Sequence, residues 1–190
     1  MLFIKFIIFN NLVLLKRTIS NLWNNYKVYR KWGLLLDKSQ IIISAENIKI
    51  GSNFGMGPYS QLFAQGKPGD ASIVIGDNVA MNFNVMINAS SGGKIIIGND
   101  VMIGPHTVMR AANHRFDDLE QPIYKQGHLP GEIIIEDDVW IAANVVLASG
   151  AKLGKGCIIS AGSVVSTKIP EYSIVAGNPG RVVLNRNNRS

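Results

Sequence analysis

A large aliphatic side chain returns at every sixth position along much of this 190-residue chain. In the longest unbroken stretch these positions hold Ile135, Ile141, Leu147, Leu153, Ile159 and Val165. Four residues after each comes a mostly small or β-branched residue, namely Val139, Val145, Ala151, Cys157, Ser163 and Ile169. A six-residue period matches neither the 3.6-residue period of an α-helix nor the irregular turns of a hairpin meander. It predicts an all-β fold with one short strand and one tight turn per repeat, and three repeats in each coil of a stacked β-helix.

Earlier segments share this phase, which is interrupted in places. The same positions hold Ile75, Met81 and Ile87, and then Ile97, Ile103 and Met109. A small bulge separates Ile87 from Ile97. Between Met109 and Ile135 the register is lost, and the polar segment 113–132 contains two prolines. We interpret 113–132 as a loop extruded from the coil, and such loops commonly carry function.

Residues 1–40 differ in composition from the rest of the chain. They hold seven basic residues and one acidic residue, whereas the remaining 150 residues hold twelve of each. The apolar stretch 1–15 is shorter than the ~20 residues that span a bilayer, and no cleavage site for a secretory signal follows it. The later mixture of aromatic and basic residues suits a lipid surface. A helical arm packed on the main domain or on a neighbouring subunit is the alternative, and it is the one that we favour from the sequence.

The single cysteine excludes an internal disulfide framework and a cysteine-based metal cluster. Cys157 occupies a repeat position that elsewhere holds Val, Ala or Ser, so its predicted role is structural. A reducing cytoplasm fits this composition, with the inner face of the membrane as an option for the arm. Nucleic acid is not an expected partner, because the charge outside the arm is balanced.

Residues 73–183 resemble the hexapeptide-repeat acyltransferases, in particular the galactoside, maltose and polysaccharide O-acetyltransferase group. The matching motifs are Ile75-Gly76-Asp77-Asn78-Val79, Ile97-Gly98-Asn99-Asp100-Val101, Asp137-Asp138-Val139-Trp140-Ile141, Ser160-Ala161-Gly162-Ser163-Val164-Val165 and Ala176-Gly177-Asn178-Pro179-Gly180-Arg181-Val182. The resemblance implies a left-handed parallel β-helix, a homotrimer with active sites between subunits, and acetyl-CoA as co-substrate without a metal. The predicted division is an arm at 1–40, a β-helix at 41–183 and a polar tail at 184–190.

The resemblance assigns the general base to His114, which also begins the longest break in the repeat. Imidazole has an ordinary pKa of ~6.5 and is well suited to accept a hydroxyl proton near neutral pH. Asn82 matches an asparagine that positions the acceptor and the reacting groups, although Asn also suits tight corners. Asn84 is a weaker candidate for the same role.

The resemblance also places the acyl-CoA donor. Trp140 matches an aromatic residue beside the donor, and the backbone near Ala143 and Ala161 would line the pantetheine channel. A backbone N–H there would stabilise the oxyanion. Lys168 and Arg181 are candidates for binding CoA phosphates, with solvated surface charge as the alternative.

The remaining polar candidates concern the acceptor. Asp117, Asp118 and His128 lie in the predicted loop, where they would orient His114, contact a sugar or only solvate the loop. His106 falls in a regular repeat and is predicted to be a turn residue. We expect acetyl transfer to a sugar hydroxyl in cell-surface polysaccharide biosynthesis. The alternatives are N-acetylation of a nucleotide-linked amino sugar and a non-catalytic β-helix that binds metal through His106, His114 and His128.

Overall fold

The computed structural model describes residues 2–37, 39–67 and 69–188, and for residues 2–14, 17 and 21 it describes the backbone alone. The chain forms two compact units, Met1–Asp37 and Lys38–Ser190. The first consists mainly of the helix α1 (Leu2–Trp32). Within the described residues, no helix has a stretch that is both long enough and apolar enough to cross a membrane.

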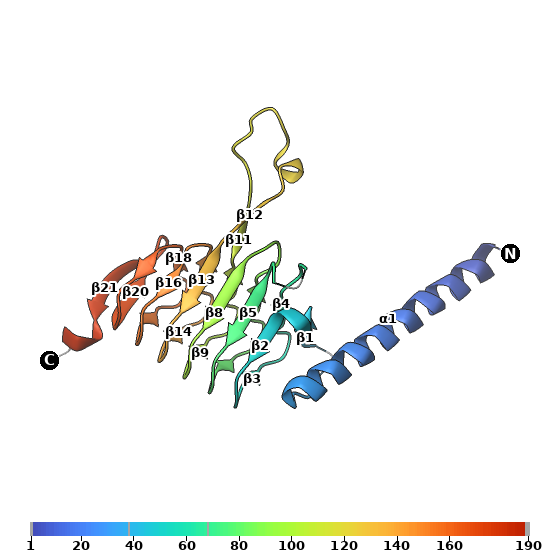
Figure 1. Ribbon diagram of the computed structural model, residues 1–190, viewed down its shortest axis with the longest axis horizontal. Helices are drawn as coiled ribbons and strands as arrows, with labels where there is room; N and C mark the ends of the chain where they lie inside the picture. The colour runs from blue at the N-terminus through green and yellow to red at the C-terminus, as the bar shows by residue number, and fades with distance from the viewer. Residues whose placement is uncertain (1, 38, 68, 189–190) are drawn as a thin grey trace. The chain divides into compact units, whose positions relative to one another are not determined.

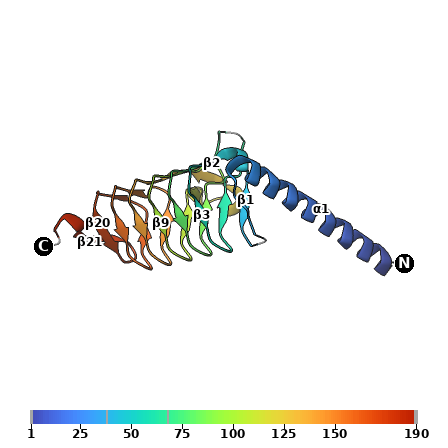
Figure 2. The same ribbon diagram turned by 90° about the horizontal axis from the view of Figure 1, so that it is seen from below.

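The second unit is a parallel β-helix built from three sheets (Figures 1 and 2). The first sheet contains β1 (Ile41–Ile43), β4 (Gln61–Phe63), β7 (Met86–Asn88), β10 (Val108–Arg110), β15 (Val146–Ala148) and β18 (Val164–Val165). The second contains β2 (Ile48–Ile50), β5 (Ser72–Ile75), β8 (Lys94–Ile97), β13 (Glu132–Ile135), β16 (Lys152–Leu153) and β19 (Lys168–Ile169). The third contains β3 (Gly55–Met56), β6 (Ala80–Met81), β9 (Met102–Ile103), β14 (Trp140–Ile141), β17 (Ile158–Ile159), β20 (Ser173–Ala176) and β21 (Arg181–Asn185). Short 3₁₀ helices occur at η1 (Ala45–Asn47), η2 (Ile123–Lys125) and η3 (Arg186–Asn188).

The six-residue period corresponds to ladders of side chains inside this prism. In the first sheet, Ile87 pairs in register with Met109, and Met109 pairs with Leu147. All three are fully buried. Burial of one such side chain contributes about 1.5–3 kcal/mol to folding. Each ladder therefore both fills the core and fixes the register between coils, and the prediction of a parallel β-helix is confirmed.

Asparagine and aspartate side chains join successive coils at the corner between the second and third sheets. The Asp77 carboxylate accepts hydrogen bonds from the Ser52 N–H (2.6 Å) and hydroxyl (2.9 Å). These bonds lower the pKa of Asp77 below its usual range, although its side chain is exposed. Asn99 Oδ1 in turn accepts from the Asp77 N–H at 2.8 Å. A Cβ on Gly76 would lie 2.5 Å from that same Asn99 oxygen, which explains why glycine precedes this corner.

A long hairpin leaves the coil between the first and second sheets. Strand β11 (Ala112–His114) pairs antiparallel with β12 (His128–Pro130), and the intervening residues project away from the prism (Figure 1). The sequence predicted an extruded loop at 113–132. The structure adds that the two ends of this loop form a short β-ladder.

The end of the chain differs from the predicted polar tail of 184–190. Strand β21 folds back antiparallel on β20 and includes Leu184 and Asn185. Arg186 then donates hydrogen bonds to the Asp138 carboxylate (3.0 Å) and to the Gly156 carbonyl (2.7 Å). The predicted tail is ordered here because the long Arg186 side chain reaches back to two neighbouring coils. Residues 189–190 lie outside the described part.

Candidate functional site

His114 ends strand β11 at the base of the hairpin. In the β11–β12 ladder its register partner is His128, and both side chains are exposed. Their ring centroids are 4.3 Å apart and the ring planes are tilted by 38°. The ladder therefore holds two imidazole rings together at the point where the hairpin leaves the coil.

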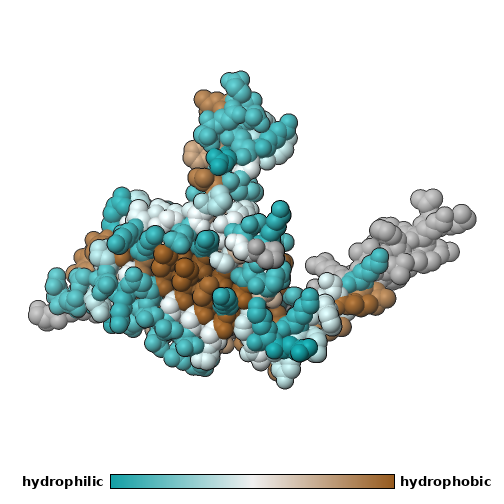
Figure 3. All heavy atoms as spheres, viewed as in Figure 1, coloured by the Kyte–Doolittle hydropathy of each residue, from teal (hydrophilic) through white to brown (hydrophobic). Residues whose placement is uncertain are grey.

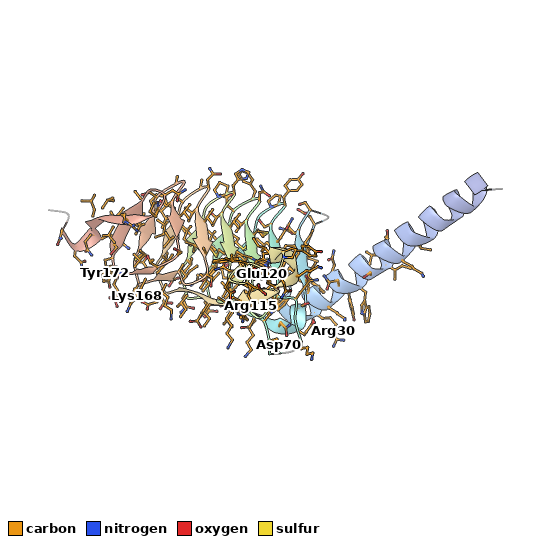
Figure 4. All side chains as sticks on the ribbon, turned by 90° about the horizontal axis from the view of Figure 1, so that it is seen from above. Arg30, Asp70, Arg115, Glu120, Lys168 and Tyr172 are labelled. Carbon is orange, nitrogen blue, oxygen red and sulfur yellow. The ribbon has the colours of Figure 1, made fainter. Side chains whose placement is uncertain are left out.

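Asp118 organises the hairpin internally. Its carboxylate accepts hydrogen bonds from the Glu120 N–H (2.9 Å) and the Gln121 side-chain amide (2.8 Å). The Gln126 amide donates to the Asp118 carbonyl at 2.7 Å and accepts from the Asp118 N–H at 3.1 Å. These bonds give Asp118 a role in shaping the hairpin, while Asp117 is exposed. Arg115 and Glu120 both lie on this hairpin (Figure 4).

The apolar side chains on the same hairpin were not singled out from the sequence. Phe116, Leu119 and Tyr124 are 70%, 92% and 76% exposed. Figure 3 shows hydrophobic atoms among the hydrophilic surface of the projecting loop. These exposed side chains could have been predicted, because large apolar residues in a segment without a repeat have no core ladder that can bury them.

Asn82 and Asn84 lie at the corner between the third and first sheets. Asn82 is exposed, and its side-chain oxygen accepts a hydrogen bond from the Phe83 N–H at 2.7 Å. Asn84 takes the left-handed backbone conformation (φ 54°), and so does His106 (φ 59°) one coil later. Asn84 Nδ2 lies 2.7 Å from His106 Nδ1. The structure thus places His106 at a turn, where it supports the Asn84 corner.

Trp140, Ala143 and Ala161 belong to neighbouring parts of two adjacent coils. Trp140 points outward from the third sheet, 48% exposed, between Met102 and Ile158 in register. Ala143 lies in the corner that follows, and its carbonyl accepts a hydrogen bond from the Gly162 N–H at 3.0 Å. Both corner residues have small side chains, and Ala161 is exposed.

Lys168 and Arg181 lie apart from one another. Lys168 is exposed on the second sheet, next to Lys152 in register, near the C-terminal end of the β-helix (Figure 4). Arg181 is exposed on β21, which extends the third sheet. The structure therefore gives the two cations separate positions on different faces.

The three corners of the prism separate the candidate residues. His114 leaves the corner between the first and second sheets, whereas Asn82, Ala143 and Ala161 share the corner between the third and first sheets. The strands of the first sheet lie between these two corners. Within one chain, the predicted base and the predicted donor channel therefore occupy different edges of the prism.

Cys157 is buried, and its thiol donates to the Pro170 carbonyl at 3.0 Å. Burial raises the pKa of this thiol above its ordinary value of 9.0. A thiolate is the reactive form, so this environment keeps the side chain inert. Over the described ranges, no three His, Cys, Asp or Glu side chains are grouped closely enough to hold a metal ion.

We expect Cys157 in the folded protein to resist modification by a thiol reagent at pH 8 and to react promptly once the chain is denatured. Because the unfolded thiol ionises at lower pH than the folded one, the free energy of unfolding should decrease as the pH rises above about 9. Absorbance of the released chromophore measures the reaction, and urea unfolding at several pH values measures the stability. Rapid labelling of the folded protein would contradict the inert assignment.

Comparison with known proteins supports this architecture. Residues 132–167 match the family model for the bacterial transferase hexapeptide (six repeats). The galactoside O-acetyltransferase of Escherichia coli K12 is 30% identical over 159 residues, covering 81% of this chain and 71% of that protein. A hexapeptide-repeat acetyltransferase of Vibrio cholerae, solved with acetyl coenzyme A, is 32% identical with a TM-score of 0.61, covering 74% of this chain and 73% of that one.

A galactoside acetyltransferase solved with coenzyme A is 31% identical, with a TM-score of 0.63, and the match covers 76% of this chain and 68% of that one. For four other curated relatives, the matched stretch spans 38–62% of their length. The chain belongs to the hexapeptide-repeat acetyltransferase family, and its β-helix is left-handed.

Proposed function

We propose that this protein transfers the acetyl group of acetyl-CoA to a hydroxyl group of a sugar. The observation that carries the proposal is the exposed His114 imidazole at the base of the hairpin, in a chain of this family. The relatives solved with acetyl coenzyme A and with coenzyme A support the identity of the donor. The E. coli relative, a galactoside O-acetyltransferase, supports a sugar acceptor.

His114 would act as the general base. The imidazole takes the proton of the acceptor hydroxyl while the oxygen attacks the thioester carbonyl carbon. A tetrahedral oxyanion forms and is held by a backbone N–H near Ala143 or Ala161. The carbon–sulfur bond then breaks, and the CoA thiolate takes the proton back from the imidazolium. The step leaves the acetyl ester and CoA thiol, with His114 neutral again.

The separation of His114 from Ala143 supports a site formed between chains. A second copy in a three-fold ring would bring the hairpin corner of one prism to the channel corner of the next. A closed cyclic assembly repeats the same contact at every interface. We therefore propose a homotrimer in which one subunit supplies the base and its neighbour supplies the donor channel, with Asn82 beside the acceptor.

The candidate residues enter this scheme with different roles. Trp140 would pack on the donor, while Lys168 or Arg181 would meet its phosphates. Asp117, Asp118 and His128 would face the acceptor from the hairpin, and Asn84 from the corner. The proposed acceptor is a hydroxyl on a cell-surface polysaccharide or its precursor.

The test is release of CoA thiol from acetyl-CoA in the presence of a panel of sugars and amino sugars. We expect release that depends on a hydroxylated sugar and an acetyl ester that mild alkali removes. An alkali-stable amide formed only on amino sugars would establish N-acetylation instead. If protein that sediments as a trimer releases no CoA thiol with either the sugars or the amino sugars, the proposed acceptor is contradicted.

Replacing Trp140 with alanine should raise KM for acetyl-CoA by about tenfold and change kcat much less. The reason is loss of an aromatic surface beside the thin pantetheine arm, worth about 1.4 kcal/mol of binding. Steady-state kinetics with varied acetyl-CoA measure the change. Ile96→Ala is the matched control, since Ile96 is a similarly exposed side chain (38%) on the second sheet. Equal KM in the two variants would remove Trp140 from the donor site.

A further inference from the structure

The described part of α1 carries an apolar stripe that the β-helix site does not use. Its members are spaced by three or four residues, which places them along one face of the helix. They are 48–65% exposed: Leu15, Ile19, Leu22, Trp23, Tyr26 and Tyr29. Figure 3 shows hydrophobic atoms along one side of the described part of the helix and hydrophilic atoms along the other.

Aromatic rings form the centre of this stripe. The Trp23 and Tyr26 rings stack with centroids 5.6 Å apart and an interplanar angle of 29°. Together with Ile19 and Leu22 they line one open apolar depression. Tryptophan and tyrosine combine an apolar ring with a polar atom, so they are favoured where an apolar phase meets water.

Basic side chains follow one flank of the stripe. Lys27 places its ammonium 5.7 Å from the Trp23 ring centroid, and Lys16 lies three helical turns earlier on the same line. Lys31, four residues after Lys27, continues the flank, Arg30 follows the stripe in the last turn, and the sequence of α1 contains no acidic residue. The positive charge of α1 therefore favours an anionic partner, whereas residues 41–190 hold equal numbers of basic and acidic residues.

We propose that α1 binds the surface of an anionic lipid bilayer. The helix lies in the plane of the headgroups, with the stripe at the boundary of the acyl chains and the basic flank on the phosphates. Long lysine and arginine side chains extend along the apolar surface while their charges stay in water. This inference rests on α1 alone and is independent of the proposed acetyl transfer.

The experiment is co-sedimentation of the full chain with vesicles of phosphatidylcholine alone or mixed with phosphatidylglycerol. We expect binding only to the anionic vesicles, weakening as salt is added. One lysine near an anionic surface contributes ~1 kcal/mol, or about fivefold in binding. Lys16→Ala with Lys27→Ala should thus bind about 25-fold more weakly. The control pair Lys49→Ala with Lys94→Ala removes the same charge from exposed positions of the β-helix and should bind as wild type.

A second variant, Leu22→Ser with Tyr26→Ser, tests the stripe and should lose binding even at low salt. Circular dichroism checks that the helix is retained. Wild-type protein that stays in the supernatant, or equal binding by all variants, overturns the proposal. So does a change in oligomeric state of the stripe variant without vesicle binding, which would identify another copy as the partner. Acetyl transfer to a water-soluble sugar should be the same in every variant, so the two proposals fail separately.

Discussion

Replacing His114 with alanine should lower the rate of acetyl transfer by about 10²-fold or more, because the acceptor hydroxyl loses its base. The alanine variant should retain its thermal stability, since the His114 side chain is exposed and leaves no cavity. CoA thiol release with a saturating sugar measures kcat. The KM for acetyl-CoA should change little, because the proposed base acts on the acceptor hydroxyl and not on the donor.

Added imidazole should restore part of the activity of His114→Ala, since it supplies the missing base in solution. His114→Gln, which keeps a polar side chain of similar reach but accepts no proton near neutral pH, should be as inactive as the alanine variant. Activity within a few-fold of wild type in either variant would exclude His114 as the base. Loss of trimer in both would instead show that the hairpin residue holds the interface.

Replacing Gly104 with alanine should destabilise the β-helix by about 3 kcal/mol, at the upper end of the usual cost of overpacking. A Cβ there would lie 2.5 Å from the Ala142 carbonyl carbon and 2.7 Å from the Ala143 nitrogen in the next coil. Both atoms belong to the backbone, so no side chain can rotate away. For a unit of this size the melting temperature should fall by about 10 °C in a thermal scan.

Gly55→Ala, in strand β3 of the third sheet, is the matched control for Gly104→Ala, which directly follows strand β9 of that sheet. A Cβ at Gly55 would meet no atom within 4 Å, and its backbone does not adopt a positive φ. Its melting temperature should stay the same or rise slightly, because alanine has less freedom than glycine in the unfolded chain. Equal melting of the two variants would show that neighbouring coils separate at Gly104 without cost.

Much of the β-helix could be predicted because the same six-residue pattern of aliphatic residues recurs in coil after coil. Ile87, Met109 and Leu147 fill the same interior position in successive coils. The repeat in the sequence therefore predicts the ladder directly. The turn residues are similarly local, since Asn84 and His106 each adopt a left-handed conformation within their own corner.

The hairpin and the C-terminal strand were harder to predict. The pairing of β11 with β12 joins residues without apolar alternation, so the His114–His128 contact has no signal in the pattern. Arg186 belongs to a run that reads as polar, and its role comes from carboxylate and carbonyl groups many residues away. The proposed meeting of His114 with a neighbour's channel depends on symmetry between chains, which no single repeat encodes.

Strand β21 also affects the open edge at the C-terminal end of the β-helix. A parallel coil presents unpaired N–H and C=O groups at its last turn, and such an edge can template the first coil of another molecule. Because β21 runs antiparallel to β20, with an irregularity between Ile174 and Val175, it covers the third sheet with a strand of opposite direction. An antiparallel strand at this position disfavours end-to-end growth into a filament through the third sheet.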